Sequence, residues 1–197
     1  MRRRTFDILM TVGGLAIAAV LVVAGVLLTW GHNFVTSEVH TQLAAQKIYF
    51  PTVTNPEFKA LPKADANAMR PYAGQLMTSG AQAEAYADHF IAFHLIGIGG
   101  GKTYSQLSAE SLAQPKNAAL AGQVQTMFRG TTLRSMLLEA YGFWQIGQIA
   151  LIAAIAAYAA AALLLVLSIL GLVHLRRVPD TAEVFAKASH AAQVQTA

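Results

Sequence analysis

Length, composition and charge already narrow the class of protein. The chain has 197 residues, of which 55% are hydrophobic and 12% charged, and its mean hydropathy is +0.45. Globular domains carry about 25% charged residues, so this composition argues against a purely soluble domain, and it excludes disordered and fibrous chains. The sequence contains no cysteine, which excludes disulfides, thiol catalysis and cysteine-ligated iron–sulfur or zinc sites.

Two long uncharged stretches predict membrane-spanning helices. Residues 8–30 include 23 positions without a charge, and residues 140–175 include 36, whereas about 20 apolar residues cross a bilayer. The longer stretch would reach about 54 Å as a helix, against a hydrocarbon core of about 30 Å, so it is expected to extend beyond the lipid. We assign 8–30 to a first transmembrane helix, and 142–175 to a second one with its outer extension.

Arginines beside these stretches predict the orientation. Three of them lie in residues 1–7 and two more, Arg176 and Arg177, follow the second stretch. Positive charge marks the cytoplasmic side of a membrane protein. We therefore interpret the formal net charge of +4 as a signal of orientation and not as a sign of nucleic-acid binding. We expect a plasma-membrane protein with both termini, 1–7 and 176–197, in the cytoplasm and residues 31–141 outside it.

A cleaved secretory signal is the alternative interpretation of the N-terminus. The apolar run of 8–30 is longer than the roughly 7 to 15 residues of a signal-peptide core, and no small-x-small cleavage pattern follows it. We therefore expect an uncleaved anchor. The tail after Val178 is short and rich in alanine and glutamine, and is expected to be loosely ordered rather than an output domain.

The region between the spans begins with a helical pattern and then a proline-rich segment. Val35, Val39 and Leu43 recur on one helical face, which predicts that the first helix continues to about Lys47. Four prolines then fall within 21 residues, at positions 51–71. Because proline disrupts a helix interior, this segment is expected to be extended.

A central helix is predicted over Ala81–Ile96. Thr78 and Ser79 offer an N-cap for it, and the stripe on its inner face is formed by Ala83, Tyr86, Ala87, Phe90 and Phe93. The glycines between positions 97 and 101 are expected to end it.

The remaining pattern predicts two more helices and a long rod. A short helix is expected over Thr103–Gln114, and another, capped by Asn117, is expected to run to Gly130. Apolar residues then recur at steps of three and four from Leu133 to Trp144 and lead directly into the second span. The expected fold is an all-α membrane protein, with two transmembrane helices flanking a small helical extracytoplasmic domain.

The glycine-rich run before Lys102 looks like a phosphate-binding loop but does not match one. The motif G-x-x-x-x-G-K-[ST] requires glycine at the position of Ile96, and no strand is predicted before it. A turned or flexible linker is the favoured interpretation. No G-x-S-x-G nucleophile signature is present either, so an enzyme is the least favoured class and no cofactor is expected.

Two groups of histidines and carboxylates are candidates for a metal or pH-sensing role. Glu84 and Asp88 share a helical face, but His89 and His94 are about 140° apart on a helix, unlike the zinc-binding H-x-x-x-H spacing. Solvated carboxylates with aromatic residues packed inward are the favoured alternative. The other histidines near the first span, His32 and His40, are expected to lie near lipid headgroups. No metal is expected.

Residues suited to lipid or protein contacts lie near the outer ends of the spans and in the domain. Tryptophan favours the headgroup boundary, arginine holds phosphate or carboxylate groups, and exposed aromatic side chains suit protein docking. The residues expected at such contacts are Trp30, Phe90, Phe93, Arg129, Arg134 and Trp144.

Small residues four positions apart predict close helix packing in the membrane. The pairs are Gly14 with Ala18 and Gly25 with Thr29, and the series is Ala153, Ala157 and Ala161. This pattern allows backbones to approach closely. It favours pairing of the two spans or a homo-oligomer, with docking against another membrane protein as the alternative.

Several segments resemble a family of small actinobacterial membrane proteins of unknown function. They are RRRTFD, WGHNFV, QLAAQKIYFP, YADHFIAFHL, GGKTYSQLS and LAGQVQTMFRGTTLRSMLLEAYGFW, and the likeness covers most of residues 2–177. The resemblance implies an actinobacterial plasma membrane and brings no catalytic residues. Members are often labelled aromatic ring-opening dioxygenases, but the scattered histidines here do not supply the iron site that such an enzyme needs.

These features predict a structural or accessory component of a membrane or envelope complex, which contacts lipid and either a protein partner or further copies of itself. The alternative is an extracytoplasmic ligand sensor, since a helical domain between two spans resembles the input half of a bacterial chemoreceptor. A sensor with so short a tail would signal through a partner.

Overall fold

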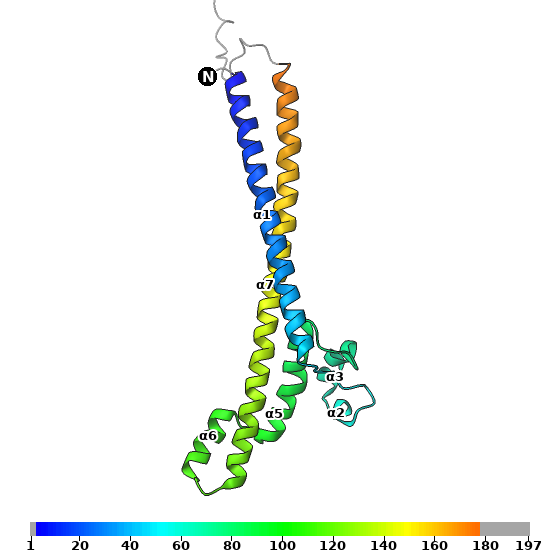
Figure 1. Cartoon of the computed structure of the whole chain (residues 1–197), viewed down its shortest axis with the longest axis vertical. Coiled ribbons are helices and arrows are strands. Elements are labelled where there is room, and N and C mark those ends of the chain that lie inside the picture. Colours follow the sequence, from blue (N-terminus) through cyan, green and yellow to red (C-terminus); the bar gives the residue numbers. More distant parts are fainter. Residues whose placement is uncertain (1–2, 178–197) are drawn as a thin grey trace, which may run out of the picture. The chain divides into compact units, whose positions relative to one another are not determined.

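The computed structural model describes residues 3–177, which are almost entirely helical (Figure 1). The predicted disorder of the tail after Val178 lies outside the described residues. The elements in chain order are α1 (Arg3–Ala45), α2 (Pro56–Lys59), α3 (Lys63–Met69), the 3₁₀ helix η1 (Arg70–Tyr72), α4 (Gly80–Tyr86), the π-helix η2 (Ala87–Ile91), α5 (Ala92–Gly99), α6 (Tyr104–Ala113) and α7 (Ala118–Leu175).

The contacts divide the chain into two units. The helix-pair unit comprises Met1–Trp30 with Ala150–Ala197, and the domain unit comprises Gly31–Ile149. Two helices, α1 and α7, pass through both units without a break. Both are long and apolar enough to cross a membrane, and their apolar side chains are largely exposed. The all-α fold and the two candidate spans are therefore confirmed.

In the helix-pair unit, α1 and α7 pack antiparallel along a seam of small residues. The buried positions recur every seven residues: Thr11, Ala18 and Gly25 on α1, and Ala154, Ala161 and Ser168 on α7. A seven-residue repeat keeps one stripe of each helix facing its partner as the two wrap around each other. The predicted packing of the two spans against each other is confirmed.

Side-chain contacts across the seam are close. A Cβ on Gly14 would lie 2.6 Å from the Oγ of Ser168, and one on Gly25 would lie 2.6 Å from the Tyr158 ring. The Thr29 hydroxyl is 3.3 Å from the Tyr158 hydroxyl. The prediction for Ala153 is wrong, because this residue is exposed and Ala154 takes the buried position. The seam follows the seven-residue repeat, whereas the prediction assumed steps of four.

In the domain unit, the C-terminal part of α1 packs into the core. Val39 and Leu43 are buried, as their spacing predicts, and α1 ends at Ala45, two residues before the expected end. Lys47 then turns the chain with a φ of +54°. An isolated antiparallel bridge between Tyr49 and Leu76 closes the loop that follows.

The proline-rich segment is not extended throughout, so that prediction is wrong. It forms α2, α3 and η1, because the last three of its prolines lie where a helix tolerates them. Pro56 occupies the first turn of α2, Pro62 is the N-cap of α3, and Pro71 lies in the short η1. The first turn leaves its N–H groups without helical partners, so proline is compatible with a helix start.

The predicted central helix exists but contains a π-turn. The Ser79 side chain caps α4 in a capping box with Gln82, as expected for this sequence. The chain then widens into η2 before α5, which ends at Gly99 and is capped by Gly100 with a left-handed φ of +58°. The insertion of the π-turn is a correction to the single regular helix expected over Ala81–Ile96.

The helix after Asn117 continues far beyond its expected end. Thr103 caps α6 and Asn117 accepts a hydrogen bond from the Leu120 N–H, as predicted. However, α7 does not stop at Gly130 but runs for 58 residues. A Cβ on Gly130 would lie 2.5 Å from the Leu95 Cδ2. This glycine therefore permits the close approach of α5 and is not a helix stop.

Candidate interaction surfaces

Trp144 packs inside the domain unit, on the first residue of α4. Its side chain is half-buried, and a Cβ on Gly80 would overlap the Trp144 Cβ. The Trp144 ring is stacked with that of Tyr141 at a centroid distance of 6.2 Å. Through the contact with Gly80, Trp144 joins α7 to α4. In the helix-pair unit, Trp30 is 65% exposed.

The two predicted arginines differ in their environments. The Arg134 Nη2 lies 2.5 Å from the Asp88 Oδ1, and its Nε donates a hydrogen bond to the Ala87 carbonyl at 3.3 Å. A guanidinium with two anchors on one turn is well oriented. Arg134 therefore joins α7 to the π-turn, whereas Arg129 is exposed and makes no ion pair among residues 3–177.

Phe90 and Phe93 belong to a chain of aromatic contacts in the domain core. Phe50 contacts Tyr86 edge-on at a centroid distance of 5.3 Å, and Tyr86 contacts Phe90 at 4.8 Å. The His94 ring lies 4.4 Å from Phe90 and 5.3 Å from Phe93. Both phenylalanines are half-buried, so they contribute more to packing than to an open surface.

Three of the four residues considered for a metal site have separate partners. His89 Nδ1 lies 2.8 Å from an Asp65 carboxylate oxygen on α3, and Asp88 pairs with Arg134. His94 Nδ1 lies 2.7 Å from the Phe90 carbonyl oxygen. Within residues 3–177 no three histidine or carboxylate side chains converge. Asp88 and His89 are consecutive in η2, so their side chains leave the helix in different directions and reach different partners.

The glycine-rich run ends α5 and leads into α6. Gly99 is buried, and a Cβ there would lie 3.2 Å from the Met127 methyl group on α7. Gly101 has a φ of +82°, a conformation that suits glycine. Lys102 makes an ion pair with Glu110 on α6 at 2.7 Å. The run therefore forms a defined turn between α5 and α6.

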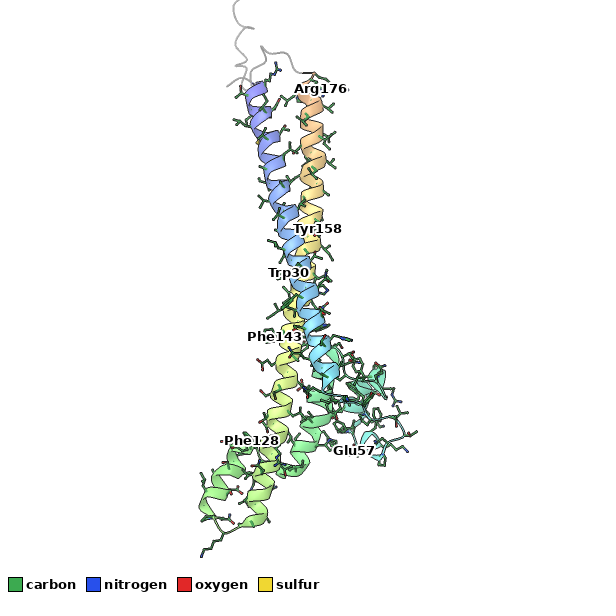
Figure 2. The ribbon with its side chains drawn as sticks, viewed as in Figure 1. Trp30, Glu57, Phe128, Phe143, Tyr158 and Arg176 are labelled. Atoms are coloured by element: carbon green, nitrogen blue, oxygen red, sulfur yellow. The ribbon has the colours of Figure 1, made fainter. Side chains whose placement is uncertain are left out.

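An apolar stripe on α7 was not anticipated as a surface by the sequence pattern. Its members are large, 49–63% exposed and lie within about 80° of the helix circumference. They are Phe128, Met136, Phe143 and Ile146. Phe128 and Phe143 are labelled along α7 in Figure 2. We call these four residues the α7 stripe. The spacing of apolar residues at steps of three and four in the sequence predicts a helix here. Spacing alone, however, does not distinguish a buried face of the helix from an exposed one.

A comparison of this chain with protein-family models, with curated proteins and with solved structures finds no match.

Proposed function

We propose that the protein is a non-enzymatic accessory component of a membrane complex. The paired helices α1 and α7 anchor it in the plasma membrane, and its helical domain docks onto a partner protein. In this proposal both termini are cytoplasmic and the domain is extracytoplasmic. Membership of the actinobacterial family that the sequence resembles is part of the proposal.

The anchoring role is supported by the chemistry of the helix-pair unit. Its outer faces expose large aliphatic residues such as Val23 and Ile152, whereas its seam buries small ones. A soluble helix pair would show the reverse pattern, with charged outer faces. Contacts of Gly25 and Thr29 with Tyr158 also support an uncleaved first helix, because they make α1 part of the folded protein.

The α7 stripe is the single observation that carries the docking role. If Ile149 marks the lipid boundary, Met136 lies 13 residues beyond it, which is about 20 Å along a helix. Phe128 lies farther still. Large apolar side chains gathered on one face in water favour a protein partner. The partner we propose therefore presents an apolar surface, such as an amphipathic helix.

The experiment uses the full chain with a photo-crosslinking amino acid at position 136, in native membranes extracted with a mild detergent. We expect a stoichiometric cross-linked partner, which is lost when the same probe is combined with Phe128→Gln and Phe143→Gln. The control, Ser105→Gln on α6, changes an exposed polar residue and should retain the partner. A protein that runs alone or only as a homo-oligomer contradicts the proposal, as does a partner retained by the double variant.

A further inference from the structure

A cavity of about 440 Å³ opens on the domain unit beside α2, α3 and η1. Its apolar wall is formed by Val53, Phe58 and Leu61, and three cations surround it: Lys59, Lys63 and Arg70. Cavities of about 300–1,000 Å³ hold small organic ligands, and a few placed polar groups determine which ones.

The three cations come from three different elements, because Lys59 ends α2, Lys63 begins α3 and Arg70 begins η1. None of them makes an ion pair among residues 3–177. By contrast, Lys102 and Arg134 of the same unit are neutralised by carboxylates. The cavity therefore concentrates uncompensated positive charge.

The two carboxylates of these short helices lie outside the lining of the cavity. Asp65 on α3 pairs with His89 of the π-turn at 2.8 Å. Glu57 on α2 acts on Tyr86: burial raises the pKa of the Tyr86 hydroxyl above its usual 10.0, and the charge of Glu57 raises it further. Neither carboxylate lines the cavity.

The cavity is held in shape before any ligand arrives. The Arg70 guanidinium carbon lies 6.0 Å from the centre of the Phe58 ring, and Phe58 is itself only 4% exposed. Asn55 caps α2 by accepting a hydrogen bond from the Glu57 N–H at 2.8 Å. The Phe50 and Gln75 backbones hydrogen-bond at 2.9 Å and close the loop. Preorganised groups lose less entropy when a ligand binds.

We propose that this cavity binds a phosphomonoester or diphosphate group carried on a small organic molecule. Three cations match a group with more than one negative charge, and a phosphomonoester carries about −1.5 to −2 at neutral pH. Arginine and lysine both bind phosphate oxygens through charge-assisted hydrogen bonds. The organic part contacts Val53 and Phe58. The site is separate from the α7 stripe and does not depend on the docking role.

The test measures binding to the full chain in two arms that distinguish the sources of phosphate. The first arm titrates pyrophosphate into detergent-solubilised protein by calorimetry. The second compares nanodiscs of phosphatidylcholine with nanodiscs that also contain phosphatidic acid, by limited proteolysis of the loop that carries Val53. If the ligand is soluble, we expect saturable binding of pyrophosphate in the first arm. If it is a lipid headgroup, we expect the loop to be protected from proteolysis only in the nanodiscs that contain phosphatidic acid.

The double variant Lys59→Gln/Lys63→Gln should weaken the observed binding by roughly tenfold or more, since it removes two charge-assisted contacts. Both side chains are exposed, so the fold should persist. The matched control, Lys116→Gln/Arg129→Gln, removes the same charge at exposed positions outside the cavity. Absence of binding in both arms overturns the proposal. So does an equal loss in the two double variants, which would show attraction by net charge alone.

Discussion

Gly80 shows how one missing side chain determines a contact in the domain. It is the first residue of α4 and is buried against Trp144 of α7. Any β-carbon at this position would overlap the tryptophan. The contact involves the backbone side of the indole, which cannot rotate away as a flexible chain end would.

Gly80→Ala should therefore destabilise the domain by about 1–3 kcal/mol, the usual penalty for overpacking. Thermal unfolding of the full chain in detergent, followed by tryptophan fluorescence, measures this change. The control is Gly142→Ala in the middle of α7, where a Cβ meets no atom within 4 Å. Alanine there should be neutral or raise the free energy of unfolding by up to about 1 kcal/mol. Equal effects of the two substitutions would contradict the packing described for Trp144.

Tyr86 predicts a loss of stability at alkaline pH. Its pKa in the folded protein is raised above 10.0, first by burial and then by Glu57. The unfolded chain releases this proton near pH 10 while the folded chain retains it. The contribution of Tyr86 to the free energy of unfolding is therefore fully present below about pH 10. It is lost as the pH rises through the higher pKa of the folded state.

Tyr86→Phe should make the free energy of unfolding less dependent on pH above about 10. Denaturant unfolding of the wild type and the variant at neutral and alkaline pH measures the difference in slope. Tyr49→Phe is the control, because the Tyr49 side chain is 61% exposed. If the Tyr86 and Tyr49 variants respond identically to alkali, the raised pKa does not contribute to stability.

At the scale of the elements, the seam between α1 and α7 is the contact that holds the helix pair. Gly171 lies opposite Thr11, so that a Cβ on the glycine would be 3.7 Å from the Thr11 Cβ. This separation is typical of a disulfide. Because the chain has no native cysteine, an engineered pair reports on the seam without interference.

The variant Thr11→Cys/Gly171→Cys should form an intramolecular disulfide on mild oxidation, detected by altered mobility in a non-reducing gel. Adding Gly14→Leu should reduce its yield, because a side chain at this position meets Ser168. Adding Gly13→Leu should not, since a Cβ there meets nothing within 4 Å. Val12→Cys with Gly171→Cys should not cross-link, as Val12 is 59% exposed. Cross-linking from position 12 as readily as from position 11 would contradict this seam.

Most helices were predictable from the sequence because their signals are local. Ser79, Thr103 and Asn117 cap the helices that follow them, and the hydropathy of both spans is unmistakable. The helix was wrongly expected to end at Gly130, because the role of this glycine depends on its contact with Leu95, a residue distant in sequence. The short helices of the proline-rich segment were missed because proline both ends and begins helices.

The candidate surfaces were less predictable than the fold. Phe90 and Arg134 have chemistry suited to binding, but the structure gives them partners inside the domain. The α7 stripe and the cationic cavity depend on exposure and on which residues converge, neither of which periodicity reveals. In particular, Lys59 and Arg70 line the same cavity although helix α3 separates them in the sequence.

At the scale of the whole molecule, the proposed topology predicts labelling by a membrane-impermeant maleimide. A single cysteine at Lys116, between α6 and α7, should react in intact cells. One at Arg176, just after α7, should react only after permeabilisation (Figure 2 labels this residue). Both native side chains are exposed, so burial does not confound the result. Reaction of both, or of the second alone, in intact cells would contradict the orientation.

The antiparallel seam also has a consequence for the order of events during synthesis. Gly14 and its neighbour Ser168 are separated by 154 positions, which a ribosome takes roughly 10 to 30 s to translate. During this interval, in the proposed topology, the first span waits in the bilayer while the domain is translocated, with Thr11 and Gly14 facing lipid. The first span is therefore inserted before its partner exists, and the two helices can pair only after α7 has been synthesised.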